Sequence, residues 1–247
     1  MAILKTNTVS GIGTEGTVFD GDITFDSLNY MTLPKGTTTQ SNRGRGVIGG
    51  GFTPTLVKTV QYIEIQSTGI SVDFGDKTDT RYAATAVSSS TRGVMAGGHS
   101  SSSSPYPVVN VMDYITIATT SNAIDFGDLL VAAANKTGTC NNTRGVMIGG
   151  YNPNTKAMDY ITIATTGNAA DFGDLTVTAY PGQGLSNGSR GVFAGGQNTP
   201  TNLNSIQYVT IASTGNAQDF GDLFEIQRQG GLTSDSHGGL AEGVSYQ

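Results

Sequence analysis

The sequence has no tryptophan, few charges and a single cysteine, Cys140. One cysteine excludes an intrachain disulfide, and with it a small disulfide-stapled secreted scaffold. Charged residues make up 13% of the chain, about half the usual ~25%, and the net charge is −6. This balance excludes the basic face that a nucleic-acid binder needs. No apolar run reaches the ~18 residues of a membrane-spanning helix, and the N-terminus lacks the regions of a signal peptide, so we expect neither membrane insertion nor export by the general secretory route.

Glycine, by contrast, is abundant, at 35 of 247 residues, roughly twice the average of ~7%. Serine, threonine and asparagine fill much of the rest of the chain. Such a composition is found in disordered linkers and also in turn-rich β-proteins. The regular recurrence of isoleucine, valine, tyrosine and phenylalanine favours the second, so the sequence predicts an all-β fold.

Two blocks of sequence recur in alternation along the chain. The first, of the type RGVMAGG, begins at Arg45, Arg92, Arg144 and Arg190, with a decayed copy, HGGLAEG, at His237. The second, of the type DYITIATTGNAADFGD, places its DFGD motif at Asp73, Asp125, Asp171 and Asp219, so that successive motifs are 52, 46 and 48 residues apart. A period near 48 residues is typical of a propeller blade of four short strands.

Each repeat can be divided into strands by its hydrophobic pattern. YITIA alternates in steps of two, and GVMAGG is an apolar run that ends in paired glycines, as expected for an inner strand followed by a tight turn. DFGDL is predicted to begin or form the outer strand, and Gly-Asn in TTGNA to make a hairpin turn before it. Leading segments such as LLVAAA and LTVTAY are predicted to supply the remaining strand. The variable polar segments between GG and DYITI are predicted to be loops that emerge on one face.

The order of these elements resembles the kelch repeat. A double glycine ends the second kelch strand, an aromatic residue lies in the third, and a large aromatic marks the fourth. The matching residues here are Gly97/Gly98, Gly149/Gly150 and Gly195/Gly196, then Tyr114, Tyr160 and Tyr208, then Phe126, Phe172 and Phe220, where kelch repeats usually have tryptophan. The resemblance implies a kelch-like β-propeller over residues 41–247, with residues 1–40 as an attachment or closure segment. We predict about five four-stranded blades, closed by joining the two termini, with four blades and an N-terminal arm as the alternative.

The N-terminal stretch LKTNTVSGIGTEGTVFDGDITF and the repeats together resemble virion structural proteins of tailed bacteriophages, especially marine phages and cyanophages. This resemblance implies a propeller module in the tail fibre apparatus, or a decoration protein of the particle, located in the virion after assembly in the host cytoplasm. The implied partners are other virion proteins, with a host-surface glycan and a second copy of the chain as further candidates. Host attachment would then be a second role.

The first three residues of DFGD match the magnesium-binding DFG motif of protein kinases, but the other kinase motifs are absent, and a catalytic centre is not built in four copies. Two carboxylates around a glycine also suit calcium, although no further acidic residues recur nearby to complete its six to eight ligands. We therefore expect no cofactor and assign the motif a structural role. Phe74, Phe126, Phe172 and Phe220 are predicted to pack between neighbouring blades, and the motif's aspartates to accept main-chain N–H groups. The once-per-repeat arginine is predicted to pair with a DFGD aspartate.

Catalytic motifs are scarce elsewhere. Neither His99 nor His237 lies beside a nucleophile motif, and Cys140 has no adjacent basic residue to lower its pKa. We therefore expect a protein that is not an enzyme, with a glycan-processing enzyme as the remote alternative. The loops between GG and DYITI are rich in serine, asparagine and tyrosine, which suits adaptable polar contacts. Tyr106 and Tyr151 in these loops are the candidate surface-binding residues, and a lectin-like propeller is the alternative function.

Overall fold

The structure is a computed structural model that describes residues 44–65, 67–103, 105–180, 183–228, 230 and 232. The chain divides into two units, Met1–Gly36 and Thr37–Gln247, and every described residue belongs to the second. The predicted closure segment 1–40 and His237 lie outside the described residues. In the described part all regular structure is β-strand, which confirms the all-β prediction. That part contains no helix able to cross a bilayer.

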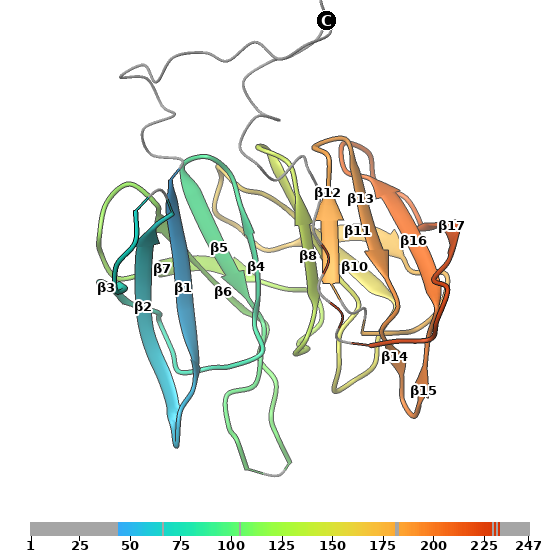
Figure 1. Cartoon of the computed structure of the whole chain (residues 1–247), viewed down its shortest axis with the longest axis horizontal. Helices are drawn as coiled ribbons and strands as arrows, with labels where there is room; N and C mark the ends of the chain where they lie inside the picture. The colour runs from blue at the N-terminus through green and yellow to red at the C-terminus, as the bar shows by residue number, and fades with distance from the viewer. Residues whose placement is uncertain are drawn as a thin grey trace, which may run out of the picture. The chain divides into compact units, whose positions relative to one another are not determined.

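Each repeat forms one antiparallel sheet (Figure 1). The first sheet has β1 (Arg45–Phe52), β2 (Leu56–Glu64) and β3 (Val72–Asp76). The second has β4 (Thr85–Ser88), β5 (Arg92–Ala96), β6 (Val111–Thr116) and β7 (Ile124–Asp128). The third has β8 (Thr137–Cys140), β9 (Arg144–Ile148), β10 (Ala157–Thr162) and β11 (Ala170–Asp174). The fourth has β12 (Gln183–Ser186), β13 (Arg190–Ala194), β16 (Ser205–Thr210) and β17 (Gln218–Asp222), and β14 (Gln197–Asn198) and β15 (Thr201–Asn202) form a separate hairpin.

The arginine-glycine block forms an interior strand that ends at the paired glycines, as predicted, but it is not the innermost strand of its sheet. Each complete sheet begins with a short polar strand, TAVS, TGTC or QGLS, and the arginine-glycine strand is second. These first strands, β4, β8 and β12, are the inner strands, through which neighbouring sheets contact one another. Glycine allows this approach, because a Cβ on Gly138 would lie 2.5 Å from the Ala86 carbonyl oxygen. Their polar composition and short length hid them from the hydrophobic pattern.

The leading segments are likewise not strands. Leu129–Ala134 connects the outer strand β7 to the next inner strand and makes one isolated bridge, from Ala134 to Tyr151. It is apolar because Leu129, Ala133 and Ala134 are buried between sheets. The DFGD prediction is confirmed, since this motif forms all but the first residue of the outer strands β3, β7, β11 and β17. Gly-Asn, however, lies in a longer connection, residues 163–169 between β10 and β11, and not in a tight hairpin turn.

The hydrophobic core lies between successive sheets. Phe126 packs in one cluster with Met147, Ile161 and Ile163 of the following sheet. Phe172 repeats this contact with Phe193, Val209 and Ile211, and Phe74 with Met95 and Ile115. All three phenylalanines are 2% exposed, which confirms the predicted packing between repeats. Phe220 departs from it and is 54% exposed, because no described sheet follows β17.

The connections that follow the double glycines emerge at one end of the sheets, as predicted. In Figure 1 the β1–β2 turn, the loop before β6, the loop before β10 and the β14–β15 hairpin all project toward the lower edge. Antiparallel strand order explains this, because every second strand of a sheet runs toward the same end. The aromatic contacts described below connect these loops across sheets.

Candidate functional site: an aromatic row above interlocked sheets

The recurring arginines connect each sheet to the next. Each guanidinium lies over the tyrosine ring of the adjacent strand, 4.1 to 4.4 Å from its centroid, in the pairs Arg45–Tyr62, Arg92–Tyr114, Arg144–Tyr160 and Arg190–Tyr208. Three of them also donate from Nη1 to a main-chain carbonyl of the following sheet: Arg45 to Ile117 (2.8 Å), Arg92 to Ile163 (3.0 Å) and Arg144 to Ile211 (3.1 Å). Arg190 has no such acceptor among the described residues.

The predicted arginine–DFGD ion pair is therefore wrong. Two of the motif's final aspartates instead pair with lysines of their own sheets, Lys58 with Asp76 at 3.3 Å and Lys156 with Asp174 at 3.1 Å. Main-chain N–H acceptance by the motif's first aspartate is seen for Asp171, whose Oδ1 accepts from the N–H of Gly173 at 3.2 Å. Three of the arginines do join neighbouring sheets, but through a main-chain carbonyl of the following sheet, while the ring that each contacts belongs to its own sheet.

DFGD forms a β-bulge that fits against the next sheet. The β6–β7 register steps from Met112↔Gly127 to Asp113↔Asp125, which leaves Phe126 as the extra residue. Gly127 has φ +136°, and a Cβ there would lie 2.5 Å from the carbonyl carbon and oxygen of Gly167. The same close approach recurs between Gly75 and Ser121, and between Gly173 and Gly215. At each of these three interfaces the DFGD motif thus supplies a bulge, a glycine at the point of close approach and a buried phenylalanine.

The asparagine of the facing turn completes this contact. The N–H of Asp128 donates to Oδ1 of Asn168 at 3.0 Å, and the N–H of Ala169 donates back to the Asp128 carbonyl at 2.8 Å. Asp76 and Asp174 make the same 3.0 Å bond to Asn122 and Asn216. The Gly-Asn dipeptide was predicted to shape a hairpin turn. Its asparagine instead accepts a main-chain N–H from the DFGD motif of the preceding repeat.

Arg144→Ala is expected to lower the free energy of unfolding by about 2–3 kcal/mol, because it removes a stacked cation and a hydrogen bond from a charged donor. Arg190→Ala is the matched control and should cost only about 0.5–1 kcal/mol, since its guanidinium stacks on Tyr208 without the carbonyl bond. Urea unfolding followed by far-UV circular dichroism measures both. Equal losses would show that the bond to Ile211 contributes little.

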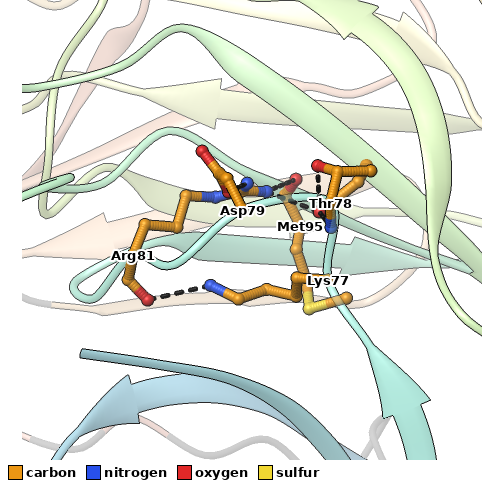
Figure 2. A network of polar contacts seen from close by, with 6 residues as sticks. Lys77, Thr78, Asp79, Arg81 and Met95 are labelled. Carbon is orange, nitrogen blue, oxygen red and sulfur yellow. Dashed lines mark hydrogen bonds and ion pairs between the residues drawn. The ribbon is translucent and has the colours of Figure 1, made fainter. Parts of the chain in front are cut away.

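Charged side chains are also buried between the first two sheets (Figure 2). The fully buried Arg81 guanidinium pairs with Asp79 and Asp113 and donates to the Met95 carbonyl at 3.1 Å. Asp113 Oδ2 also accepts from the main-chain N–H and the hydroxyl of Thr78, at 3.0 and 2.9 Å. Lys77 donates from Nζ to the Arg81 carbonyl at 2.8 Å. Burial, reinforced by the Arg81 charge, lowers the pKa of Lys77 to about 8.

The next two interfaces reuse the position of Asp113 with different chemistry. Asp159 pairs with Lys136, Nζ to Oδ2, at 3.1 Å, and both side chains are almost fully buried. Burial raises the pKa of Asp159 and lowers that of Lys136, each partly offset by the other's charge. In the fourth sheet Gln207 accepts from the N–H and hydroxyl of Thr176 at 2.9 and 2.7 Å. An amide can replace the carboxylate, so this position holds sheets together and needs no titratable group.

The loop end carries a row of rings in contact with one another, which we call the aromatic row: Phe52, Tyr82, His99, Tyr106, Tyr151 and Tyr180. His99 is its centre. The His99 ring stacks on Tyr82 with centroids 5.0 Å apart and meets Tyr106 and Tyr151 edge-on at 6.4 and 6.3 Å. Tyr151 continues the row to Tyr180 at 5.3 Å, and Phe52 extends it from Tyr82 at 6.1 Å.

The structure brings the two predicted surface residues together. Tyr106 and Tyr151 come from different repeats, are 47% and 39% exposed, and flank the buried His99. Polar bonds hold them in place: the Tyr106 carbonyl accepts from Asn152 Nδ2 at 3.0 Å and lies 3.0 Å from His99 Nδ1. The row therefore offers ring surface on a fixed frame, an arrangement that suits stacking against apolar faces of a ligand.

Sequence reasoning missed the other members of the row. A signal was present, because the residue directly after the glycines is Phe52, His99, Tyr151 and Gln197 in successive repeats. Gln197 continues the pattern as a polar member: the Tyr180 hydroxyl donates to its Oε1, which also accepts from Arg228 Nη1 at 2.9 Å. Within the described residues no group of three or more histidine, cysteine, aspartate or glutamate side chains is placed to hold a metal ion.

Comparisons with known proteins give a likeness of fold. No protein-family model matches the chain, and no curated protein matches it significantly. Among solved structures, one titled "Structure of YjhT" matches with a TM-score of 0.57 at 10% sequence identity. The match covers 71% of this chain and 65% of YjhT, just under two thirds of that protein's length. At this identity the likeness concerns the fold alone. It agrees with an all-β protein of repeated antiparallel sheets, in a propeller-like or sandwich-like arrangement.

Proposed function

We propose that this protein is a structural component of a phage particle, in the tail fibre apparatus or as a decoration protein, which binds a surface partner through the aromatic row. The row carries the proposal, because it places exposed tyrosines from successive repeats on one rigid face. The phage setting rests on the sequence resemblance described above. In this role the protein binds and assembles without catalysing a reaction.

The ligand class that the row fits best is a host-surface polysaccharide. Tyrosine rings stack on the apolar faces of sugar rings, and neighbouring amides bond their hydroxyls. Tyr106 and Tyr151 supply the rings, and Asn152 lies beside them. A lectin-like propeller that acts outside a particle would use the same face, and it remains the second candidate because the row supports both.

We also propose that the sheets belong to a kelch-like propeller of about five blades, closed by the chain's two ends. The last sheet supports this, because Phe220 is exposed and a Cβ on Gly221 would meet nothing within 4 Å. The first sheet differs from the others: Ile70, 91% exposed, stands where later repeats have the receiving asparagine. The outer face of the first sheet is thus suited to pack against a segment that lacks the DFGD motif. Four blades and an N-terminal arm is the alternative.

Binding to a glycan array tests the function. The wild-type protein is expected to bind a bacterial surface polysaccharide, and Tyr106→Ala/Tyr151→Ala to lose at least about tenfold in affinity, as expected when two stacking rings are removed. Ile124→Ala, which truncates an exposed side chain on the outer strand β7, is the control and should bind as wild type.

Particle incorporation separates the two candidates. A chain lacking residues 1–25 is expected to be excluded from particles while it still binds the polysaccharide. Normal incorporation of that chain would contradict attachment through the N-terminal segment. Binding by a protein that never enters particles would favour the lectin-like alternative, and no binding by the wild-type protein would contradict the role of the aromatic row.

A further inference from the structure

The aromatic row ends in a polar pair in the fourth repeat. In two repeats the residue after the glycines and the residue six positions beyond the last DFGD aspartate contact each other as rings, Phe52 with Tyr82 and Tyr151 with Tyr180. The same two positions of the fourth repeat hold Gln197 and Arg228, and the guanidinium donates from Nη1 to the amide oxygen at 2.9 Å. A hydrogen bond from a charged donor thus replaces a pair of rings.

Main-chain hydrogen bonds show that Arg228 is equivalent in space as well as in sequence. The carbonyl of the residue before this position accepts the N–H of the second glycine of its own repeat: Ala133 from Gly98 at 3.0 Å, Ala179 from Gly150 at 3.2 Å, and Gln227 from Gly196 at 3.0 Å. The segment after β17 therefore follows the same path as the segments after β7 and β11. Arg228 consequently takes at the loop end the position that Tyr180 holds in the preceding repeat.

Gln197 holds the guanidinium in place. The glutamine is buried, and both ends of its amide are bonded: Oε1 accepts from the Tyr180 hydroxyl and from Arg228, and Nε2 donates to the Pro200 carbonyl at 3.2 Å. Because these bonds fix the amide, they also fix the edge of the guanidinium that it contacts. Arg228 itself is exposed, and its bond to Gln197 uses only one of the several N–H donors of a guanidinium.

The loops around the row supply no side chain that competes with Arg228 for charge. No lysine, arginine, aspartate or glutamate occurs in the loops that follow the glycines, residues 52–55, 99–110, 151–155 and 197–204. Arg228 therefore adds a positive charge at one end of a face lined by rings. A planar guanidinium makes paired, charge-assisted hydrogen bonds with a carboxylate. A ligand that lies along the rings and carries a carboxylate complements both parts of this face.

We propose that Gln197 and Arg228 form an anion subsite at the end of the aromatic row, and that the ligand is an acidic polysaccharide whose carboxylate pairs with the Arg228 guanidinium. This inference rests on the proposed function, because the rings must bind the neighbouring sugars. It adds the charge of the ligand, which rings alone do not select. The competing role for Arg228 is a structural one, in an ion pair with a carboxylate of the chain itself.

An array of neutral, carboxylated and phosphorylated polysaccharides tests the proposal with the full chain. The wild-type protein is expected to bind carboxylated members, and Arg228→Gln to bind them at least about tenfold more weakly, because the charged donors are lost. Arg228→Lys keeps the charge without the planar fork and should fall between the two. Raising the salt concentration from about 50 to about 500 mM should weaken binding by the wild-type protein much more than binding by Arg228→Gln. Lys58→Gln is the matched control, since it removes an equal charge from a side chain of β2 that is 52% exposed, and it should bind as wild type.

The outcomes distinguish the failure of this subsite from the failure of the proposed function. Chemical reduction of the carboxyl groups of a bound polysaccharide should abolish the difference between the wild-type protein and Arg228→Gln. Binding confined to neutral or phosphorylated polysaccharides would overturn the carboxylate subsite and leave the role of the aromatic row intact. Unchanged binding by Arg228→Gln would overturn it as well, and a lower melting temperature of that variant would then indicate the structural role. No binding of any polysaccharide by the wild-type protein would contradict the proposed function and the subsite together.

Discussion

Replacing Gly127 with alanine is expected to lower the free energy of unfolding by about 3–5 kcal/mol, from backbone strain and overpacking together. The residue has φ +136°, and its Cβ would lie 2.5 Å from main-chain atoms of Gly167 in the next sheet. Those atoms cannot move alone, because the same turn holds Asp128 through Asn168. Urea unfolding monitored by circular dichroism or tyrosine fluorescence measures the loss.

Substitutions at two other glycines distinguish backbone strain from overpacking as the cause of the loss. Gly69→Ala changes a turn glycine in open space without positive φ and should cost less than about 0.5 kcal/mol. A loss for Gly127→Ala no larger than this would contradict the prediction. Gly221 has the same φ, +137°, but nothing described lies near it, so strain alone predicts about 1–2 kcal/mol for Gly221→Ala. A loss equal to that at Gly127 would indicate that a further sheet packs there, as the five-blade proposal requires.

Lys136→Met is expected to destabilise the protein by about 3–5 kcal/mol, because it leaves a buried carboxylate without its counter-charge. The lysine is the ion-pair partner of Asp159, and neither side chain is more than 1% exposed. Burial already raises the pKa of Asp159, and loss of Lys136 raises it further. A carboxyl with a raised folded-state pKa costs stability above its unfolded pKa and regains it as pH falls. The variant's deficit should therefore shrink in acid.

The double variant Lys136→Met/Asp159→Met provides the control. Apolar side chains of similar volume remove both charges at once, so stability should return to the wild-type value or exceed it. Thermal unfolding of the single and double variants at neutral and acidic pH tests this. A double variant as unstable as the single one would show that the loss came from packing around the lysine stem and not from the unpaired charge.

Several features could be predicted from the sequence because they depend on local pattern. Alternation in DYITI predicted β6 and β10, and the repeated DFGD predicted the outer strands and the buried Phe126 and Phe172. The inner strands were missed because TGTC and QGLS are too short and polar to show a hydrophobic period. LLVAAA was misassigned because burial between sheets makes a connecting segment as apolar as a strand.

The candidate site, too, could be predicted only where local pattern was enough. Tyr106 and Tyr151 could be selected because exposed aromatic residues in polar loops suit binding. Their neighbourhood could not be foreseen, since His99 joins them across two repeats. The arginine partner was missed for a similar reason. Its acceptor is a main-chain carbonyl of the next sheet, and every residue carries one, so the sequence contains no signal for it.

By itself, then, the sequence determined the repeat, its period, the all-β class and the phenylalanines that fill the interfaces, because each follows from spacing and from the apolar character of single residues. Only the tertiary structure decided what the DFGD motif does. Four copies could have bound calcium, an arginine or only their own turn. Packing of one sheet on the next makes Gly127 a point of close approach, Phe126 a buried bulge residue and Asp128 a main-chain donor to Asn168. These contacts join residues about 40 positions apart, a distance over which local pattern carries no information about partners.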